Sequence, residues 1–335
     1  MFSKHDFIPD FILPDQDGAL VRFYGTAGGE IRLLAFVPNV DETPLCLHLS
    51  TLLSRATALG VPVTFIVDQA PENPIDGADI YVDQAHKIRD RWQVESGCHL
   101  FLLNENLRVL HTFDVALPAD WLDVLDKCLA ERAAHIGSTV SAAPVLTVPY
   151  ALDHDFCDHL MSIWETKGNR ETGVEISAGG RRVEATQSLF KRRRDHTVES
   201  AELVREITRR VTRRVAPEVH KAFAFRATHY EGFKIVRYDS EVGGFFARHR
   251  DNLSPSTAHR RFALSLNLND DYDGGELCFP EYGEGKYRPN KGGAIIFSGS
   301  LLHEALPVTQ GHRFVLISFL YRAADRRRPG QSTKA

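Results

Sequence analysis

Six short apolar segments, each bounded by turn-forming residues, follow one another in the last third of the chain. They read FKIVRYD, GFFARHRD, RFALSLNLN, GELCFP, GAIIFSG and RFVLISFLYR, and the turns between them include DSEVGG, DDYDGG, PNKGG and TQGH. Short strands at this spacing are typical of an all-β barrel or jelly roll. A fold of this kind brings together side chains that are far apart in the sequence.

Two helical patterns precede these strands. The first, DHDFCDHLMSIWETKG, has Asp153 as a candidate N-cap. The second is SAELVREITRRVTRRVAPEV, in which Leu203, Ile207, Val211 and Val215 recur every fourth residue and the arginines lie elsewhere. The second helix would therefore have one apolar face, and we predict that both helices support the β domain.

The first 138 residues have a different pattern. IRLLAFVP and VPVTFIVD are apolar throughout, as buried strands are, and LCLHLSTLLSRATALG between them is typical of a helix. HLFLLNENLRVLHTF predicts a hairpin that turns at residues 104–106. Helical patterns lie before and after this hairpin, in AHKIRDRWQV and PADWLDVLDKCLAERA. This order indicates a small α/β domain.

A small, uncharged stretch, IGSTVSAAPVLTVPYAL, separates the two parts. Residues 1–135 carry 10 basic and 20 acidic side chains, and residues 136–335 carry 30 and 24, so the charges of about −10 and +6 sum to the −4 of the chain. We predict a domain at 1–138, a linker at 139–146 and a second domain at 147–325, with its core at about 229–322.

Three features of the whole chain bear on its location. No run of about 18 apolar residues is present, so we expect no membrane span. The first residues lack the apolar segment of a signal peptide. The five cysteines are odd in number and scattered, which favours a reducing compartment. We therefore expect a cytoplasmic protein.

His249 and Asp251 raise the question of a metal site. Residues two apart on a strand point to the same face, so both side chains would lie together. His303 follows the apolar strand GAIIFSG and is the strongest candidate for a third ligand. Two histidines and one carboxylate with open positions are the ligands of non-haem Fe(II) oxygenases. The alternative is a polar patch, because the pattern His-x-Asp is common by chance.

Arg313 favours the metal site over the polar patch. It lies ten residues after His303, on the next predicted strand. A guanidinium inside a barrel is costly to bury without an anion, and its geometry matches a carboxylate. An internal arginine one strand from the metal ligands therefore predicts a bound dicarboxylate.

From about Glu231 to Tyr321 the chain resembles the prolyl-4-hydroxylase-like group of Fe(II)- and 2-oxoglutarate-dependent oxygenases. The stretches that carry the resemblance are YDSEVGGFFARHRDN, LSLNLNDDYDGGELCFPE, YRPNKGGAIIFSGSLLHEALPVTQGHR and the final FLY. The resemblance implies a double-stranded β-helix, or jelly roll, with supporting helices. It implies iron ligation by His249, Asp251 and His303, and binding of the distal 2-oxoglutarate carboxylate by Arg313. The resemblance also matches Tyr238 to a tyrosine that reaches the cosubstrate pocket, and Asn267 to a polar position on the strand beside it. A core polar role is the alternative for both.

The cofactors implied by the resemblance are Fe(II), 2-oxoglutarate and O2, with ascorbate as an optional addition. The implied reaction is hydroxylation with release of succinate and CO2. Its substrate stays open between a protein residue and a small molecule. The basic cluster at residues 191–194 could steer an anionic substrate or nucleic acid, but we favour a solvated loop or strand edge there. We expect no nucleic acid partner, and a homodimer stays open.

The segment FVPNVDETPLCLHL resembles the active-site loop of the peroxiredoxins, in which Thr-Pro-x-Cys opens a helix. The cysteine is Cys46 here, and the start of a helix lowers a thiol pKa. The resemblance covers about residues 6–130 and implies a thioredoxin-like domain. The family's proline stands four residues before the threonine, whereas Pro38 stands five before Thr43. Its arginine ahead of the hairpin is also absent.

In place of that arginine the chain has Cys98 and His99. One hypothesis is that Cys98 lies close to Cys46 and forms a redox-labile pair with it. The favoured alternative is a degenerate thioredoxin-like domain with ordinary buried cysteines. Two further functions therefore stay open beside the dioxygenase: a thiol-dependent peroxidase or redox sensor that acts through Cys46, and a non-catalytic binding protein.

Overall fold

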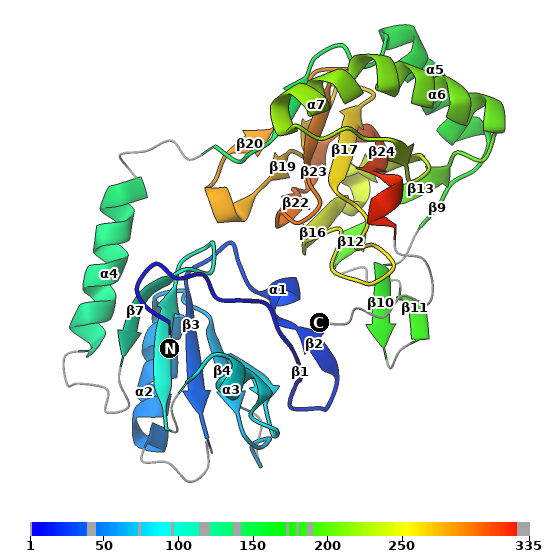
Figure 1. Cartoon of the computed structure of the whole chain (residues 1–335). Helices are drawn as coiled ribbons and strands as arrows, with labels where there is room; N and C mark the ends of the chain where they lie inside the picture. Colours follow the sequence, from blue (N-terminus) through cyan, green and yellow to red (C-terminus); the bar gives the residue numbers. More distant parts are fainter. Residues whose placement is uncertain are drawn as a thin grey trace. The chain divides into compact units, whose positions relative to one another are not determined.

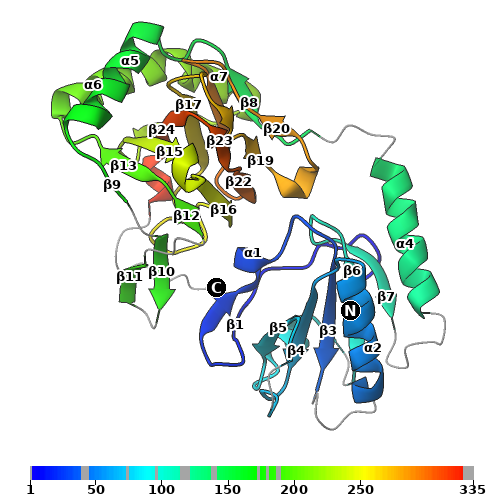
Figure 2. The same cartoon turned by 180° about the vertical axis from the view of Figure 1, so that it is seen from behind.

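The computed structural model describes the chain in nine segments: 2–38, 45–72, 75–94, 97–113, 121–136, 142–171, 174–178, 181–185 and 190–326. The chain divides into two compact units, which Figures 1 and 2 show from opposite sides. The first contains Met1–Ala142 and Pro280–Gly283, and the second contains Ala143–Phe279 and Glu284–Ala335. Part of the predicted linker, residues 139–141, lies outside the described segments.

The first unit contains a five-stranded sheet in the order β5-β4-β3-β6-β7. Strands β3, β4 and β5 are parallel, whereas β6 is antiparallel to both β3 and β7. The bounds are β3 Arg32–Val37, β4 Val63–Val67, β5 Ala78–Val82, β6 His99–Leu103 and β7 Val109–Phe113. A short hairpin of β1 (Ile12–Pro14) and β2 (Leu20–Arg22) precedes them. The predicted α/β order and the β6–β7 hairpin are confirmed.

Strand β3 is buried on both faces, which explains its unbroken apolar sequence. Leu33 and Ala35 lie in one core cluster, and Leu34 and Phe36 lie in another. The helices of this unit are α1 (Phe23–Thr26), α2 (Leu45–Ala58), α3 (Lys87–Arg91) and α4 (Trp121–Ile136). The helix predicted at AHKIRDRWQV is present but shorter than that stretch, because α3 is a single turn. His86 before it is in the left-handed backbone region, with a φ of 52°.

The second unit consists mainly of two antiparallel sheets. The larger has the order β8-β21-β17-β24-β15-β13-β9, with β14 also paired to β24, and the smaller has the order β12-β16-β22-β19-β20. The larger sheet contains β8 (Leu146–Val148), β9 (Arg170–Glu171), β13 (Arg194–Thr197), β14 (His229–Tyr230), β15 (Lys234–Asp239), β17 (Phe262–Asn267), β21 (Ala294–Ser298) and β24 (His312–Tyr321). The smaller contains β12 (Lys191–Arg192), β16 (Phe245–His249), β19 (Leu277–Cys278), β20 (Lys286–Tyr287) and β22 (His303–Ala305).

Two hairpins, β10–β11 (Val174–Ala178 and Arg181–Ala185) and β18–β23 (Asp273–Gly274 and Val308–Gln310), complete the strands. Each of the six apolar segments contains a strand, as predicted. These are β15, β16, β17, β19, β21 and β24.

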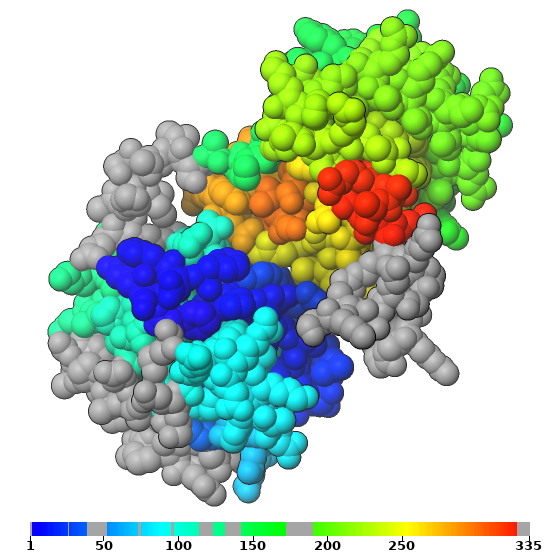
Figure 3. Space-filling view, viewed as in Figure 1, coloured from blue at the N-terminus to red at the C-terminus, as the bar shows by residue number. Residues whose placement is uncertain are grey.

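Three helices pack on the larger sheet: α5 (His154–Thr166), α6 (Ala201–Arg214) and α7 (Ala216–Phe223). The predicted stripe of α6 is confirmed, since Ile207 and Val211 are fully buried. In Figure 3 the yellow-green atoms, which include those of α6 and α7, form one side of this unit. The sheet's other face is therefore left to form the site.

The two helix starts differ in how they are capped. The Ser200 hydroxyl accepts a hydrogen bond from the Leu203 amide at the start of α6. Asp153 stands at the N-cap of α5, as predicted, but its side chain makes no capping bond. Its carboxylate pairs instead with Arg210 and Arg214 of α6, which ties the two helices together. Among the described residues, no helix has the length and apolar character needed to cross a bilayer.

Candidate metal centre

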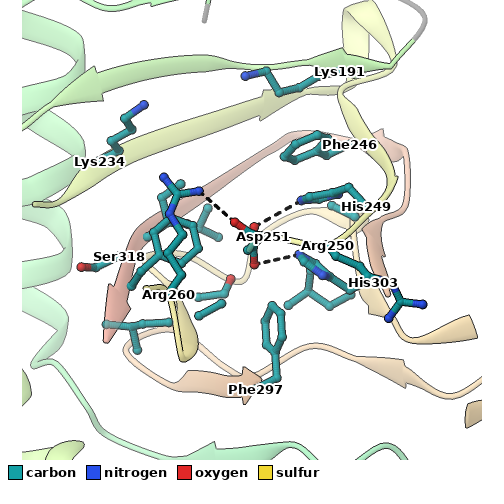
Figure 4. Close-up of a pocket in the computed structure, with 18 of the residues that line it drawn as sticks. Lys191, Lys234, Phe246, His249, Arg250, Asp251, Arg260, Phe297, His303 and Ser318 are labelled. Carbon is teal, nitrogen blue, oxygen red and sulfur yellow. Dashed lines mark hydrogen bonds and ion pairs between the residues drawn. The ribbon is translucent and has the colours of Figure 1, made fainter. Parts of the chain in front are cut away.

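Strand pairing between β16 and β22 brings the three predicted ligands together. His249 ends β16 and His303 begins β22, and the two residues are direct partners in the pairing. Asp251 follows β16 by two residues. The ligand atoms of the three residues all lie within 4.8 Å of one another. Figure 4 shows the two imidazoles directed at the carboxylate.

Each imidazole presents its Nε2 atom to the centre. The Nε2 atom of His249 lies 3.6 Å from Asp251 Oδ1, and that of His303 lies 3.5 Å from Asp251 Oδ2. The Nδ1 atoms are occupied by main-chain oxygens, at 2.7 Å from Ala247 and 3.0 Å from Leu301. A histidine that donates its Nδ1–H to a carbonyl keeps Nε2 available as a lone-pair ligand.

The protonation states of the cluster fit a divalent cation. Burial lowers the pKa of His249 well below its usual value, and His303 lowers it further, so His249 is neutral. Neutral imidazole is the form that ligates metals. Burial raises the pKa of Asp251, whose buried Oδ2 atom accepts no hydrogen bond. A metal ion would compensate this carboxylate oxygen, which the described part of the chain leaves without a donor.

Tight packing holds the ligands in place. The Phe246 ring stacks on His249 with centroids 3.6 Å apart, and the Phe297 ring meets His303 at 4.6 Å. The Asp251 amide donates to the Gly299 carbonyl at 2.9 Å. A Cβ atom at Gly299 would lie 2.9 Å from the Arg260 carbonyl oxygen, so a side chain there would displace the loop that carries Asp251.

The cluster opens into a cavity of about 640 Å³, within the range of small-molecule sites. Alternate residues of β24 form one wall, because side chains two apart share a face. These residues are Arg313, Val315, Ile317 and Phe319. The opposite wall includes Phe246 and Leu277 of the smaller sheet.

Arg313 is buried without a counter-ion. It is 2% exposed, and no carboxylate of the described segments forms an ion pair with it. Its Nη2 atom makes only long contacts, at 3.4 Å to Asn267 Oδ1 and 3.5 Å to Ser265 Oγ, and its Nε atom has no partner. An anion in the cavity would compensate this charge, as the sequence predicted.

Gly275 leaves space for the Arg313 side chain. A Cβ atom at Gly275 would lie 2.9 Å from the Cδ atom of Arg313, and the residue has a φ of +68°. The sequence predicts a turn at DDYDGG, which contains Gly274 and Gly275. That interpretation is incomplete, because Gly275 is also required by the position of the arginine.

Tyr238 and Asn267 differ in their relation to the cavity. Tyr238 lines it, is paired with Arg313 across β15 and β24, and has its ring 5.4 Å from the guanidinium. Asn267 is buried behind Arg313. Its amide nitrogen donates to Tyr272 and to the Pro289 carbonyl, so its oxygen is held in a fixed position toward the guanidinium.

The cavity also contains basic residues whose place there the sequence did not predict. Lys191, Arg193 and Lys234 all line it. The favoured interpretation of a solvated edge is wrong for Arg193, whose side chain is 9% exposed and donates to the Tyr238 hydroxyl at 3.1 Å. The signal that could have revealed it is the alternation of Lys191, Arg193 and Asp195, three residues that share a face when the segment is extended.

The thiol candidates of the first unit are only partly described. Thr43 and Pro44 lie outside the described residues, and nothing is described of the Cys46 side chain. Cys98 is a free, buried cysteine, and burial raises its pKa despite the opposing charge of Arg89. The proximity of Cys98 and Cys46 therefore stays a prediction. His99, which follows Cys98 in the sequence, is also buried.

Comparison with known proteins agrees with this geometry. Residues 233–321 match the family model of the 2OG-Fe(II) oxygenase superfamily. This segment is a 2OG-Fe(II) oxygenase domain. It contains all three clustered ligands and Arg313.

Similar proteins include a PKHD-type hydroxylase of Prochlorococcus marinus, 37% identical over 78 residues, which are 22% of this chain and 35% of that protein. The chain thus spans about a third of that relative's length. Among solved structures, a viral collagen prolyl hydroxylase from Paramecium Bursaria Chlorella virus-1 is 18% identical with a TM-score of 0.41, over 54% of this chain and 98% of that one. A thiol:disulfide interchange protein from Chlorobium tepidum is 21% identical with a TM-score of 0.33, over 39% of this chain and 98% of that one.

Proposed function

We propose that this protein is an Fe(II)- and 2-oxoglutarate-dependent dioxygenase that hydroxylates its substrate and releases succinate and CO2. One observation carries the proposal: a two-histidine, one-carboxylate cluster and a buried guanidinium without a counter-ion share one cavity. A structural metal site would account for the cluster but not for Arg313.

His249, Asp251 and His303 would hold the iron from one side and leave its other positions facing the cavity. When bound, Fe(II) supplies the activation of O2 that no amino-acid side chain provides. The protein contributes orientation, since the ligands are fixed by Phe246 and by main-chain carbonyls. Retention of three protein ligands leaves room for a bidentate cosubstrate and O2.

Arg313 would bind the distal carboxylate of 2-oxoglutarate through paired N–H donors. Ser265 and Asn267 orient the guanidinium from behind, and the Tyr238 ring covers its face. Val315, whose side chain lines the cavity and is buried, helps to exclude water around this charge pair. Low water content strengthens such an interaction.

We also propose a thioredoxin-like domain at residues 1–138, a linker at 139–146 and the dioxygenase domain at 147–325, in a cytoplasmic protein. The parallel β3–β4 pair followed by the antiparallel β6–β7 hairpin supports the first assignment. Four cysteines, Cys98, Cys128, Cys157 and Cys278, are free thiols, which agrees with a reducing compartment. Nothing described of Cys98 favours a peroxidase.

The test is succinate formation from 2-oxoglutarate by the full-length protein with Fe(II) and O2. We expect slow, iron-dependent turnover without added substrate, and a loss of more than about 100-fold in His303→Ala, because even partners of metal ligands contribute 10–100-fold. His220→Ala is the matched control, since His220 is an exposed histidine of α7. Equal turnover in the His303→Ala variant would show that the cluster is not the catalytic centre.

A further inference from the structure

The cavity carries more positive charge than the cosubstrate requires. Its lining contains two acidic and six basic side chains: Glu231, Asp251, Lys191, Arg193, Lys234, Arg250, Arg260 and Arg313. With the proposed cofactors bound, the charges of Fe(II), ionised Asp251, the 2-oxoglutarate dianion and Arg313 cancel. The remaining basic residues must therefore serve the protein itself or another ligand.

Two of the remaining arginines are engaged by the protein. Arg260 donates to both oxygens of Glu231, at 2.8 and 2.5 Å. Arg250 donates to the Ser300 carbonyl at 2.6 Å, and in Figure 4 its guanidinium is directed away from the carboxylate of Asp251. Both arginines thus have roles in holding the loops around the metal ligands.

Arg193 and Lys234 share one carboxylate. Asp195 is fully buried and lies 3.0 Å from Arg193 Nε, whereas Lys234 Nζ is 3.9 Å from the same carboxylate. The close contact belongs to the arginine, and the lysine is beyond hydrogen-bond distance. Arg193, Lys234 and Asp195 together therefore have a net charge of +1, which lies mainly on the ammonium group of Lys234.

Lys234 lies far from the proposed cosubstrate pocket along the strand. It is four residues before Tyr238 on β15, and its partner on β24 is Ile317, whereas Tyr238 is the partner of Arg313. Four residues of a strand span about 13 Å. The Lys234 side chain is 43% exposed, so it stands at the open end of the cavity, where a second ligand would enter.

Lys191 provides a second ammonium group on the same side of the metal ligands as Lys234. It faces Phe246 in the pairing of β12 with β16, and its Nζ atom lies 5.5 Å from the Phe246 ring. That ring stacks directly on His249, so Lys191 is one aromatic layer from a metal ligand. Figure 4 shows Lys191 and Lys234 on the same side of the metal cluster.

Two aromatic rings form an apolar surface between this basic end and the metal ligands. Phe190 and Phe246 meet edge to face at 5.6 Å, and both line the cavity. Such a surface can hold the carbon skeleton of a ligand whose charged end is bound elsewhere. The distribution of polar and apolar groups is therefore that of a site for an amphiphilic anion.

We propose that the substrate is a small molecule with an oxyanion, a carboxylate or a phosphate, bound by Lys234 and Lys191. Its carbon skeleton lies against Phe246 and reaches the iron. This inference rests on the proposed function and names the substrate class of the same cavity. Arg193 is a positioning residue, because its N–H groups are directed at Tyr238 and Asp195.

The test is calorimetric titration of the full-length protein with inorganic phosphate and, separately, acetate. The protein is loaded anaerobically with Fe(II) and saturating 2-oxoglutarate, at constant ionic strength in chloride, so that no turnover occurs. We expect the Kd of one or both anions to rise about tenfold in the Lys191→Gln/Lys234→Gln double variant, the equivalent of losing about 1.4 kcal/mol.

Lys221→Gln is the matched control. Lys221 is on α7, 80% exposed, and its Nζ atom is also 3.9 Å from a carboxylate, that of Glu218. We expect its anion affinity to equal that of the unmodified protein. The Lys191→Arg/Lys234→Arg variant keeps the charge and should keep anion binding, which separates loss of charge from loss of folding.

Binding of phosphate alone, or of acetate alone, with dependence on the two lysines supports the proposal and identifies the oxyanion. Absence of binding, or equal affinity in the double variant, overturns it. The visible absorption of the Fe(II)–2-oxoglutarate complex is recorded in the same samples. If that absorption is present while anion binding is absent, the substrate inference fails and the proposed function stands; if it is absent, the proposed function fails.

Discussion

The cluster of metal-ligand side chains in the second unit and the thiol motif in the first unit were each predicted from a short sequence pattern. They differ in the residues that surround the pattern. His249, Asp251 and His303 converge with Arg313 in one cavity, each with chemistry that complements the others. Cys98, by contrast, is a buried thiol whose pKa is raised. A short motif thus indicates function only when the groups that tune it are also present.

The largest difference between the two regions should be in iron binding. We expect His249→Ala and Asp251→Ala to weaken Fe(II) binding more than about 100-fold, since loss of a residue that only hydrogen-bonds to a metal ligand already costs about 10–100-fold. The Cys46→Ser/Cys98→Ser variant should bind iron like the unmodified protein. Anaerobic equilibrium dialysis with metal analysis measures both. A comparable loss of iron binding in the thiol variant would contradict the difference proposed between the two regions.

Arg313 should show the next largest effect. Removal of one partner from a buried charge pair costs about 2–5 kcal/mol, so Arg313→Gln should raise the KM for 2-oxoglutarate between about 30- and 4,000-fold. The KM of the Arg313→Lys variant should lie between those of the unmodified protein and Arg313→Gln, because lysine keeps the charge but loses the paired donors. The loop control is Arg261→Gln, at a 50% exposed arginine outside the cavity lining. An unchanged KM in Arg313→Gln would remove the cosubstrate role.

The cysteines of the chain should differ in reactivity according to their burial. Burial raises the pKa of Cys157 to about 11, and it raises that of Cys98 as well. A raised pKa leaves less thiolate, the reactive form, at pH 8. We expect both to react with iodoacetamide at least about tenfold more slowly than the half-buried Cys128, as measured by mass spectrometry. Rapid labelling of Cys98 would favour the redox hypothesis.

The smallest predicted effect concerns stability at the cavity wall. Burial would raise the pKa of Glu231, but Arg260 and His259 outweigh it and lower the pKa below the usual value. A lowered folded pKa stabilises the protein above the unfolded pKa, and this contribution is lost as the pH falls through the folded pKa. Glu231→Gln should therefore cost about 1 kcal/mol at pH 7 and less in acid.

Urea unfolding at pH 7 and in acid measures this change. Glu218→Gln on α7 is the control, since the Glu218 side chain is 46% exposed. A cost that is the same at both pH values would contradict the proposed ion pair. Such a result would not bear on the three metal-ligand side chains. The experiment therefore tests only the ion pair in the wall of the cavity.

Much of the second unit could be predicted from local sequence. Turn residues divide the chain into strands, and alternation along a strand places His249 and Asp251 on one face. The position of Arg193 could not be predicted in this way. Its burial depends on the ring of Phe246, which lies at 5.1 Å and comes from a distant part of the chain. Asn267 likewise has a role set by Arg313, its neighbour only in the folded sheet.

The most direct test of the central claim is an anaerobic titration of the protein with Fe(II) in the presence of 2-oxoglutarate, followed by visible absorption. We predict a weak charge-transfer band that saturates at one iron per chain and is absent in Asp251→Ala. A protein that gives no band, or an Asp251→Ala variant that gives the same band, would contradict it.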